Sequence, residues 1–224
     1  MHQLISKKII LYLFLFLFLV TISNTTIRDL SLPKISNVKI SGLNLSETKE
    51  IENVIKNLNF ESLYFLNKLD IKEKLNSIKI IEEFSIFKKY PSTLLVDIKK
   101  TKFLAITKKN GSDYLFGSNR KLIKNNNMIS NLPYIFGDPD VKEFFEFKHK
   151  VDKSKLSFNE ISKMYFFKSN RWDVETSKGY LIKLPTNDIE NSLNLFINLQ
   201  EDNFFQDKTI IDLRQKNQII IDGK

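Results

Sequence analysis

The side chains most often used in catalysis are few in this sequence. It contains no cysteine and two histidines, His2 and His149. His2 precedes a long apolar run, and His149 stands between two lysines on a predicted helix, so we do not expect them to share a site. Without clustered histidine or cysteine, a zinc site of the usual ligand types is not expected.

Two pairs of carboxylates have spacings that favour structural roles over acid–base catalysis. Asp138 and Asp140 flank Pro139, a pattern typical of a turn followed by a helix start. Glu82 and Glu83 are adjacent, so on a strand they face opposite sides of the sheet. The sequence has neither a P-loop nor a G-x-S-x-G nucleophile motif. We therefore predict that the protein is not an enzyme and has no metal site and no cofactor.

The net charge of +9 does not indicate a nucleic-acid partner. Proteins that read bases and phosphates rely on the planar fork of arginine, and this chain has only four arginines, at positions 28, 120, 171 and 214. The lysines are spread along the whole chain rather than gathered on one element. We interpret the charge as a solvated surface, with a mild attraction to anionic membranes as a further possibility.

An apolar run of 14 residues, Ile9 to Ile22, follows Lys7 and Lys8. Alone it covers about 21 Å, and extended to Ile27 it reaches about 28 Å, near the thickness of a bilayer core. We predict a transmembrane anchor over residues 9–27. The alternative is a cleaved secretory signal, whose apolar core is this short, although the sequence lacks an A-x-A-like cleavage site.

The charges around this run predict its orientation. Because positive residues stay in the cytoplasm, residues 1–8 form a cytoplasmic head and the remainder is exported. The absence of cysteine is compatible with an oxidising compartment. The exported part is long enough for one large or two small domains.

Residues 34–104 contain the signals of a small α+β unit. A strand at Val38 and Ile40 ends at Gly42, and Asn44 with Glu47 forms a capping-box-like helix start. A second capping signal at Asp70 and Glu73 predicts another helix. Alternating strands around Phe84–Ile86 and Leu94–Ile98 complete the order strand, helix, helix, strand, strand. Two helices must then cover one face of a three-stranded sheet.

Residues 105–224 predict a larger sheet with flanking helices. Asn110-Gly111 is a strong hairpin signal. Helices are expected over residues 139–150 and from a cap at Thr186 to residue 199. Strands are expected at the following ranges: 105–108, 114–116, 121–123, 161–167, 172–176, 180–184, 211–214 and 219–221. The fold class is α+β, with an antiparallel or mixed sheet in this second domain.

The last strand contains three consecutive isoleucines, Ile219 to Ile221, which on a strand point to both faces of the sheet. One face can rest on the helix of residues 186–199. A terminal strand with an apolar residue on its other face and unpaired backbone groups suits the addition of a partner's strand. The alternative is a central strand buried on both faces. Asp212 and Arg214 share a strand face, so they can also pair with each other.

The order of elements in the first unit resembles a POTRA domain of the FtsQ/DivIB family of cell division proteins. Val38 to Gly42 is similar to the family's "V-x-I-x-G" segment, and Tyr90-Pro91-Ser92-Thr93-Leu94 to its "aromatic-P-x-x-L" segment. Leu132 to Gly137 is similar to "L-P-x-L-x-G", Arg171-Trp172 with Gly179 and Leu184 to "R-W-x-(V/L)…G…L", and Ile211 to Arg214 to "(I/V)-D-L-R".

Two positions depart from the family pattern. Residues 100–105 retain only the alanine, Ala105, of the usual "E-x-x-P-x-A" segment. Gln215 stands where an aromatic residue often follows "D-L-R".

The resemblance implies a bitopic inner-membrane scaffold at the division septum, with its C-terminal domains in the periplasm. It implies binding to the small coiled-coil protein FtsB (DivIC), together with FtsL-type membrane division proteins. The implied partner-binding residues are Arg214, Gln215, Asn217, Gln218, Ile219 and Ile220. The alternative is an exported POTRA-type chaperone or transport accessory that captures unfolded outer-membrane substrates.

Overall fold

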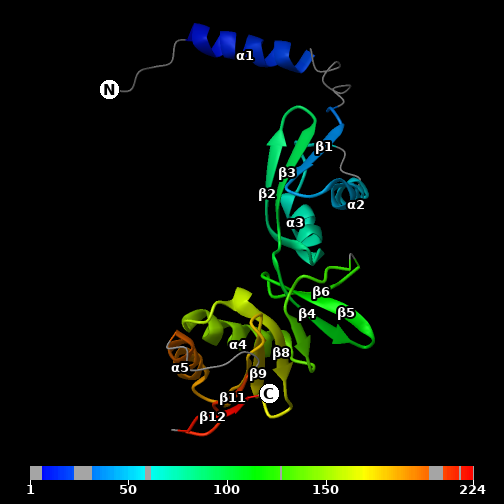
Figure 1. Cartoon of the computed structure of the whole chain (residues 1–224). Coiled ribbons are helices and arrows are strands. Elements are labelled where there is room, and N and C mark those ends of the chain that lie inside the picture. The colour runs from blue at the N-terminus through cyan, green and yellow to red at the C-terminus, as the bar shows by residue number, and fades with distance from the viewer. Residues whose placement is uncertain are drawn as a thin grey trace, which may run out of the picture.

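The computed structural model describes residues 7–22, 32–58, 62–126, 128–201, 209–216 and 218–223. Figure 1 shows a helix near the N-terminus, a small α+β unit and a larger sheet flanked by helices. The two units have separate hydrophobic cores. The chain therefore builds the mixed helix-and-sheet architecture predicted from its sequence.

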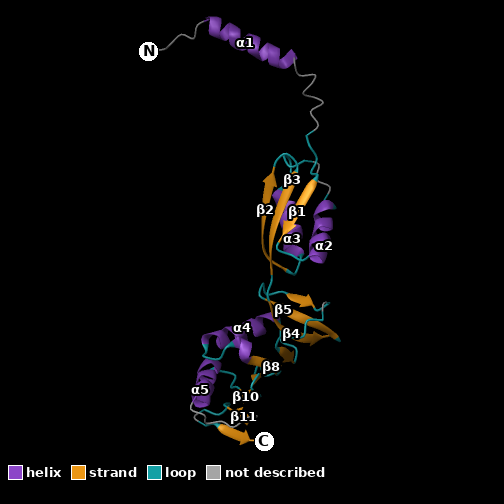
Figure 2. Cartoon of the chain, turned by 45° about the horizontal axis from the view of Figure 1, so that its top comes forward, coloured by secondary structure: helices purple, strands orange, loops and turns teal. Residues whose placement is uncertain are grey.

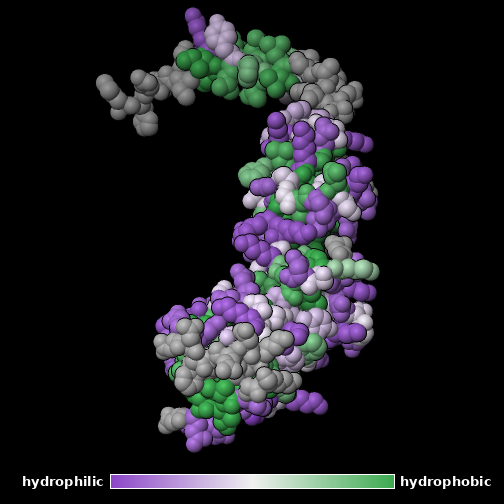
Figure 3. All heavy atoms as spheres, in the orientation of Figure 1, coloured by the Kyte–Doolittle hydropathy of each residue, from purple (hydrophilic) through white to green (hydrophobic). Residues whose placement is uncertain are grey.

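The first helix is α1 (Lys7–Ile22), and after its two lysines residues 9–20 are all apolar and exposed. Figure 3 shows one apolar face of this helix. The helix has 16 residues, so it is about 24 Å long. It ends where the apolar run ends, before the polar stretch that begins at Ser23. Among the described residues, no helix combines the length and the apolar character needed to cross a membrane. The predicted continuation over residues 23–27 lies outside the described residues.

The small unit contains a three-stranded sheet in the order β1-β3-β2, in which β1 runs parallel to β3 and β2 runs antiparallel to it. Figure 2 shows its two helices beside this sheet. Its elements are β1 (Asn37–Ser41), α2 (Leu45–Lys56), α3 (Lys68–Ser77), β2 (Ile81–Lys89) and β3 (Thr93–Lys100).

The core of the small unit confirms that its two helices share one face of the sheet. Ile51 and Ile55 of α2, with Leu75 of α3, are buried in one cluster with Leu94 and Val96 of β3. Alternation along β3 gives these strand residues a common face. The predicted strand pattern and helical stripe are therefore both present.

One of the two predicted helix caps in the small unit is correct. Asn44 and Glu47 form a complete capping box at the start of α2. At α3 the cap is Asn67, whose side chain accepts from the amide of Leu69 at 3.0 Å, and Asp70 lies inside the first turn. The prediction of Asp70 as cap was wrong because the helix starts three residues earlier, where Asn67 accepts a hydrogen bond from one of the free amides of the first turn.

The described residues of the large unit form a nine-stranded mixed sheet in the order β12-β11-β10-β9-β8-β7-β4-β5-β6. Its strands are β4 (Phe103–Lys109), β5 (Ser112–Gly117), β6 (Leu122–Lys124), β7 (Tyr134–Phe136), β8 (Ile161–Phe166), β9 (Trp172–Thr176), β10 (Leu181–Lys183), β11 (Thr209–Asp212) and β12 (Ile220–Gly223). Its helices are α4 (Val141–Lys153) and α5 (Ile189–Glu201), and a 3-10 turn spans Phe158–Glu160.

Both helices pack against this sheet. Phe147 of α4 stacks on Trp172 of β9, with ring centroids 4.5 Å apart, and Phe196 of α5 lies in the same buried cluster. Asp140 caps α4 through a complete capping box, so the Asp-Pro-Asp segment is a helix start as predicted. The predicted cap of α5 was wrong, because the helix begins at Ile189 rather than after Thr186.

A loop between β5 and β6 joins the two units. The side-chain amide of Asn119 donates to the carbonyls of Lys79 and Ile81 at 2.8 and 2.9 Å. Ser118 donates to Glu82 at 2.6 Å. These bonds hold the large sheet against the end of the small unit from which β2 starts.

Two glycines with positive φ allow the cost of backbone strain to be compared with the cost of a steric clash. A Cβ at Gly137 (φ +102°) would lie 2.4 Å from the carbonyl oxygen of Phe166, whereas one at Gly111 (φ +78°) would meet nothing within 4 Å. Gly111→Ala should lower the free energy of unfolding by about 1 kcal/mol, because alanine is strained at a left-handed φ. We expect Gly137→Ala to lose at least about twice as much, because a contact this close forces the backbone to shift. Urea unfolding followed by the fluorescence of Trp172 measures both; equal losses would contradict the clash.

Candidate functional site at the open edge of the large sheet

The last strand, β12, lies at one end of the large sheet. Within the described residues it pairs with β11 alone, antiparallel, with Ile211 opposite Ile221 and Asp212 opposite Ile220. The structure therefore does not place β12 between two strands. One side of its backbone faces outward, where its amides and carbonyls have no described strand to bond.

The isoleucines of this edge are exposed on both faces of the sheet. Ile219, Ile220 and Ile221 are 36%, 53% and 40% exposed. Figure 3 shows a hydrophobic group at the bottom of the molecule, where Figure 1 places β12. The expectation that α5 covers one face of this strand was wrong. The buried residues of α5, such as Leu193, belong instead to the cluster that contains Ile182 of β10 and Ile211 of β11.

The turn between β11 and β12 contains most of the remaining predicted site residues. Arg214, Gln215 and Gln218 are exposed, and the amide of Gln218 donates to the carbonyl of Gln215 at 3.4 Å. Asn217 lies outside the described residues. The turn therefore places the predicted residues next to the open strand.

A cleft of about 1040 Å³ adjoins this edge. One wall is the start of α5, with Asn191 and Leu195, and another is the turn with Gln215, Gln218 and Ile219. Arg171 and Arg214 also line it. Four of the six predicted residues thus border one cleft: Arg214, Gln215, Gln218 and Ile219. Ile220 lies beyond it, on the strand.

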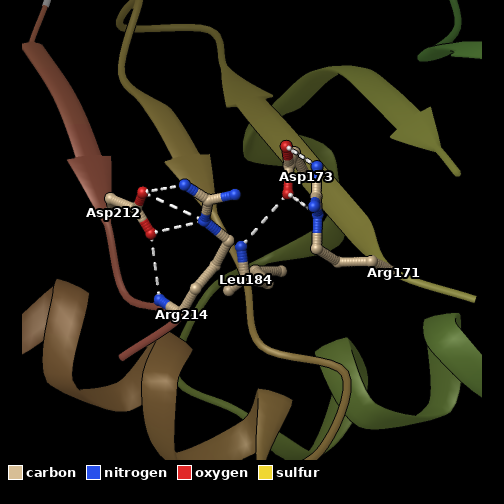
Figure 4. A network of polar contacts seen from close by, with 5 residues as sticks. All are labelled: Arg171, Asp173, Leu184, Asp212 and Arg214. Atoms are coloured by element: carbon tan, nitrogen blue, oxygen red, sulfur yellow. Dashed lines mark hydrogen bonds and ion pairs between the residues drawn. The ribbon is translucent and has the colours of Figure 1, made fainter. Parts of the chain in front are cut away.

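An ion pair fixes Arg214 at the mouth of this cleft (Figure 4). Its Nε donates to the two carboxylate oxygens of Asp212 at 2.8 and 3.0 Å, and its backbone amide donates to Oδ1 at 3.0 Å. The hydrogen bond from the guanidinium lowers the pKa of Asp212. Asp212 is buried, and the two residues pair with each other. Asp212 therefore acts as the partner that orients Arg214.

A second ion pair, at the start of β9, lies beside the Asp212–Arg214 pair. Arg171 donates to Asp173 at 3.3 and 3.4 Å, and the amide of Leu184 donates to the same carboxylate at 3.3 Å. Asp173 is buried, and burial raises its pKa despite these donors. The guanidinium of Arg171 also lies 4.0 Å from the ring centroid of Phe167.

Sequence reasoning missed Asp173 as a member of this site. Arg171 and Asp173 are separated by two positions on a strand, the same spacing as Asp212 and Arg214. Alternation would have placed the first two side chains on one face. Their nearness to Arg214 comes only from the pairing of β9, β10 and β11.

The site combines three recognition elements. The open strand offers backbone donors and acceptors, the isoleucines offer apolar contact, and the two guanidiniums offer charged donors for carboxylates. Each guanidinium is already oriented by an aspartate, so little further ordering is needed when a partner binds. This arrangement suits the binding of an extended polypeptide.

The opposite pKa shifts of the two aspartates give opposite pH dependence. For Asp212 the folded-state pKa lies below its ordinary 3.8, so its contribution is present above about pH 4 and is lost as the pH falls through the lowered value. For Asp173 the raised pKa makes ionisation unfavourable in the folded state, a cost that grows as the pH rises above 3.8. Asp212→Asn should therefore destabilise the fold more at pH 7 than at pH 3. For Asp173→Asn, the free energy of unfolding should rise relative to that of the unmodified chain as the pH increases from 3 to 7.

Urea unfolding monitored through Trp172 at pH 3, 5 and 7 measures both differences from the unmodified chain. Asparagine keeps the shape of each side chain, so the comparison isolates the charge. Parallel pH profiles for the two variants would contradict the assignment of opposite shifts.

Comparison with known proteins gives two matches along the chain. Residues 34–100 match the "POTRA domain, FtsQ-type", and residues 105–214 match "Cell division protein FtsQ/DivIB, C-terminal". The second match ends at Arg214. The turn after it and β12 therefore lie outside the matched ranges.

Curated relatives carry the same family names. Cell division protein FtsQ of Rickettsia bellii is 25% identical over 84% of this chain and 72% of its own length. Cell division protein DivIB of Clostridium botulinum is 29% identical over 87% of this chain and 81% of its own length. FtsQ of Bradyrhizobium diazoefficiens is 22% identical, and the match spans 48% of that longer protein.

A solved structure of the major extracytoplasmic domain of DivIB from Geobacillus stearothermophilus covers 48% of this chain and 99% of its own. The identity is 14% and the TM-score 0.35, which is too low to support an argument from shape. The two domain matches, in the expected order, and the curated relatives confirm the resemblance read from the sequence. The chain belongs to the FtsQ/DivIB family of cell division proteins.

Proposed function

We propose that this protein is a non-catalytic scaffold of the bacterial divisome that binds other membrane division proteins by β-strand addition at β12. The observation that supports this most is the place of β12 at the end of the sheet, with Ile219, Ile220 and Ile221 exposed. Membership of a cell division family supports the cellular role. The strand and its neighbouring turn supply the binding residues.

In this mechanism the partner contributes an extended segment that pairs with the outer side of β12. Backbone hydrogen bonds supply affinity that does not depend on the partner's sequence. Alternate side chains supply selection, because Ile220 and Ile221 point to opposite faces of the sheet. A segment that carries apolar residues at alternate positions would cover exposed isoleucine while satisfying the backbone of the edge.

The partner we propose is FtsB (DivIC), acting together with an FtsL-type protein. The cleft beside the edge is large enough to take further residues of the partner beyond the paired strand. Arg171 and Arg214 line that cleft, so acidic side chains next to the partner's strand would find charged donors there. Arg214, Gln215, Gln218, Ile219 and Ile220 are the proposed contacts, with Asn217 added from the sequence alone.

We also propose that the apolar run of α1 holds the chain at the bacterial inner membrane, at the septum. Support comes from the apolar surface of α1 on every side and from Lys7 and Lys8 at its start. The proposed organisation is a cytoplasmic head (1–8), a single-pass anchor (9–27), a periplasmic POTRA domain (34–104) and a periplasmic β domain (105–224). The separate cores of the two folded units support the last boundary.

The mechanism predicts that damage at β12 removes partner binding without unfolding the protein. Ile220→Lys places a charge on the edge, and deletion of residues 218–224 removes the strand. In a pull-down with FtsB, both variants should retain less than about a tenth of parental binding, which corresponds to a loss of ~1.4 kcal/mol or more. The deletion removes the backbone bonds of the strand. The substitution removes an apolar contact and places an unpaired charge against the partner. Leu45→Lys, on an exposed leucine of α2, adds the same charge elsewhere and should bind normally. Undiminished binding by the edge variants would refute the site.

A proline pair tests whether binding uses the backbone. In a strand, successive amides point to opposite sides, so proline at Ile220 and at Ile221 removes bonds on different sides of β12. One substitution should weaken FtsB binding and leave urea unfolding unchanged, and the other should loosen the β11–β12 hairpin. Two variants with identical binding and stability would argue that side chains alone make the contact.

A further inference from the structure

One end of the POTRA unit, here called the POTRA tip, brings together three chain segments: residues 34–36, 62–70 and 87–92. The amide of Ser36 donates to the carbonyl of Ser92 at 3.0 Å, which joins the first and last segments. The rings of Tyr64 and Tyr90 lie 4.9 Å apart and join the second and third. The tip is the end of the unit at which the chain arrives from α1 (Figure 2).

Large apolar and aromatic side chains of the tip are exposed. Phe65 is 82% exposed, and four further side chains are half or more exposed: Tyr64, Leu69, Phe87 and Tyr90. They come from the α2–α3 turn, the first turn of α3 and the end of β2. The buried cluster of the unit contains none of the five. A concentration of this kind on one end of a small domain marks an interaction surface.

Two lysines fix the loops of the tip in place. The Nζ atom of Lys68 donates to the carbonyl of Ile86 at 3.0 Å, and the Nζ atom of Lys88 donates to the carbonyl of Leu66 at 2.9 Å. Lys68 therefore joins the start of α3 to β2, and Lys88 joins β2 to the α2–α3 turn. The aromatic side chains are presented by a cross-linked framework of the fold.

The charge of the tip is strongly positive. Its three segments contain Lys34, Lys68, Lys88 and Lys89, against one acid, Asp70. Lysines beside exposed aromatic rings form the combination found where proteins meet the headgroup layer of a membrane. There the rings enter the interface and the ammonium groups attract lipid phosphates.

The covalent chain keeps the tip near α1. Ten residue steps separate Ile22, the last residue of α1, from Leu32, and a fully extended chain covers at most about 36 Å in ten steps. A bilayer that holds α1 would therefore always lie within reach of the tip. The other end of the POTRA unit contacts the large sheet through Asn119 and cannot offer a second free surface there.

We propose that the POTRA tip docks on the surface of an anionic phospholipid bilayer, with Phe65, Tyr64 and Tyr90 in the headgroup region and the lysines against lipid phosphates. This contact rests on the membrane attachment in the proposed function and adds a second, interfacial contact to it. It holds the POTRA unit upright on the membrane. Strand addition at β12 does not require it.

The lack of cysteine in the chain makes a direct test simple. Ser92→Cys introduces a single thiol at the tip, which takes an environment-sensitive dye. The full chain is incorporated into nanodiscs of phosphatidylcholine, with or without phosphatidylglycerol, that contain lipids spin-labelled near the headgroup. We expect quenching of the dye in the anionic discs to be at least threefold stronger than in discs of phosphatidylcholine alone. The same dye on Ser169→Cys, in the β8–β9 turn beside the distant cleft, should stay unquenched.

Two variants in the Ser92→Cys background test the residues named. Phe65→Glu should abolish the quenching, and Lys89→Glu should weaken binding of the tip about fivefold or more, with a loss that shrinks in high salt. Both side chains are exposed, so neither change should alter unfolding by urea. Leu45→Glu, on an exposed leucine at the start of α2 and outside the tip, is the matched control and should quench like the parent.

The outcomes separate this contact from the rest of the mechanism. A chain that stays in the disc with an unquenched dye at residue 92, or with quenching that Phe65→Glu does not change, overturns the lipid contact alone. A dye that becomes shielded only when FtsB is added identifies a protein as the occupant and also overturns it. A chain that leaves the disc refutes the membrane attachment and the tip contact together. Measurement of FtsB binding at β12 in detergent tests the strand-addition mechanism separately, because no bilayer is present.

Discussion

Every strand at the end of a sheet carries backbone amides and carbonyls that only water or another chain can bond, and this constraint shapes the C-terminal end of the protein. In β12 the constraint coincides with isoleucines exposed on both faces. Apolar side chains hinder hydration of the backbone beside them, so the edge has both unsatisfied bonding groups and uncovered apolar surface. A partner strand relieves both at once. The cleft and the arginines belong to the proposed binding site because they border that edge.

The edge can serve as a template only if the strand behind it is rigid. Ile211 of β11 is fully buried, and β11 runs parallel to β10 after the chain has crossed over through α5. At the end of β11, Asp212 is held by the backbone amide and the side chain of Arg214. The last described strand therefore rests on a neighbour fixed by core packing on one side and by a charged pair at its end.

Local signals in the sequence predicted much of the fold, and the failures share one cause. The Asn44 capping box and the alternation that buries Leu94 and Val96 depend on residues close in sequence, and both are present. The misplaced caps at Asp70 and Thr186 also had local patterns, but Asn67 caps α3 earlier and α5 begins later, at Ile189. Edge position is harder still, because a period of two shows which residues share a face and not which strand lies beside it. Asp173 was missed for the same reason, since strand order alone brings it to Arg214.

The arrangement of the two proposed contacts has a mechanical consequence. The POTRA tip and β12 lie at opposite ends of the folded part of the chain, with the junction at Asn119 between them (Figure 1). Asn119, Ser118 and Lys121 bind backbone or side-chain groups of the POTRA unit directly. Any orientation that a bilayer imposes on the tip is then transmitted through this junction to the large sheet. A partner anchored in the same membrane would meet β12 at a restricted height and angle, which raises its effective concentration at the edge.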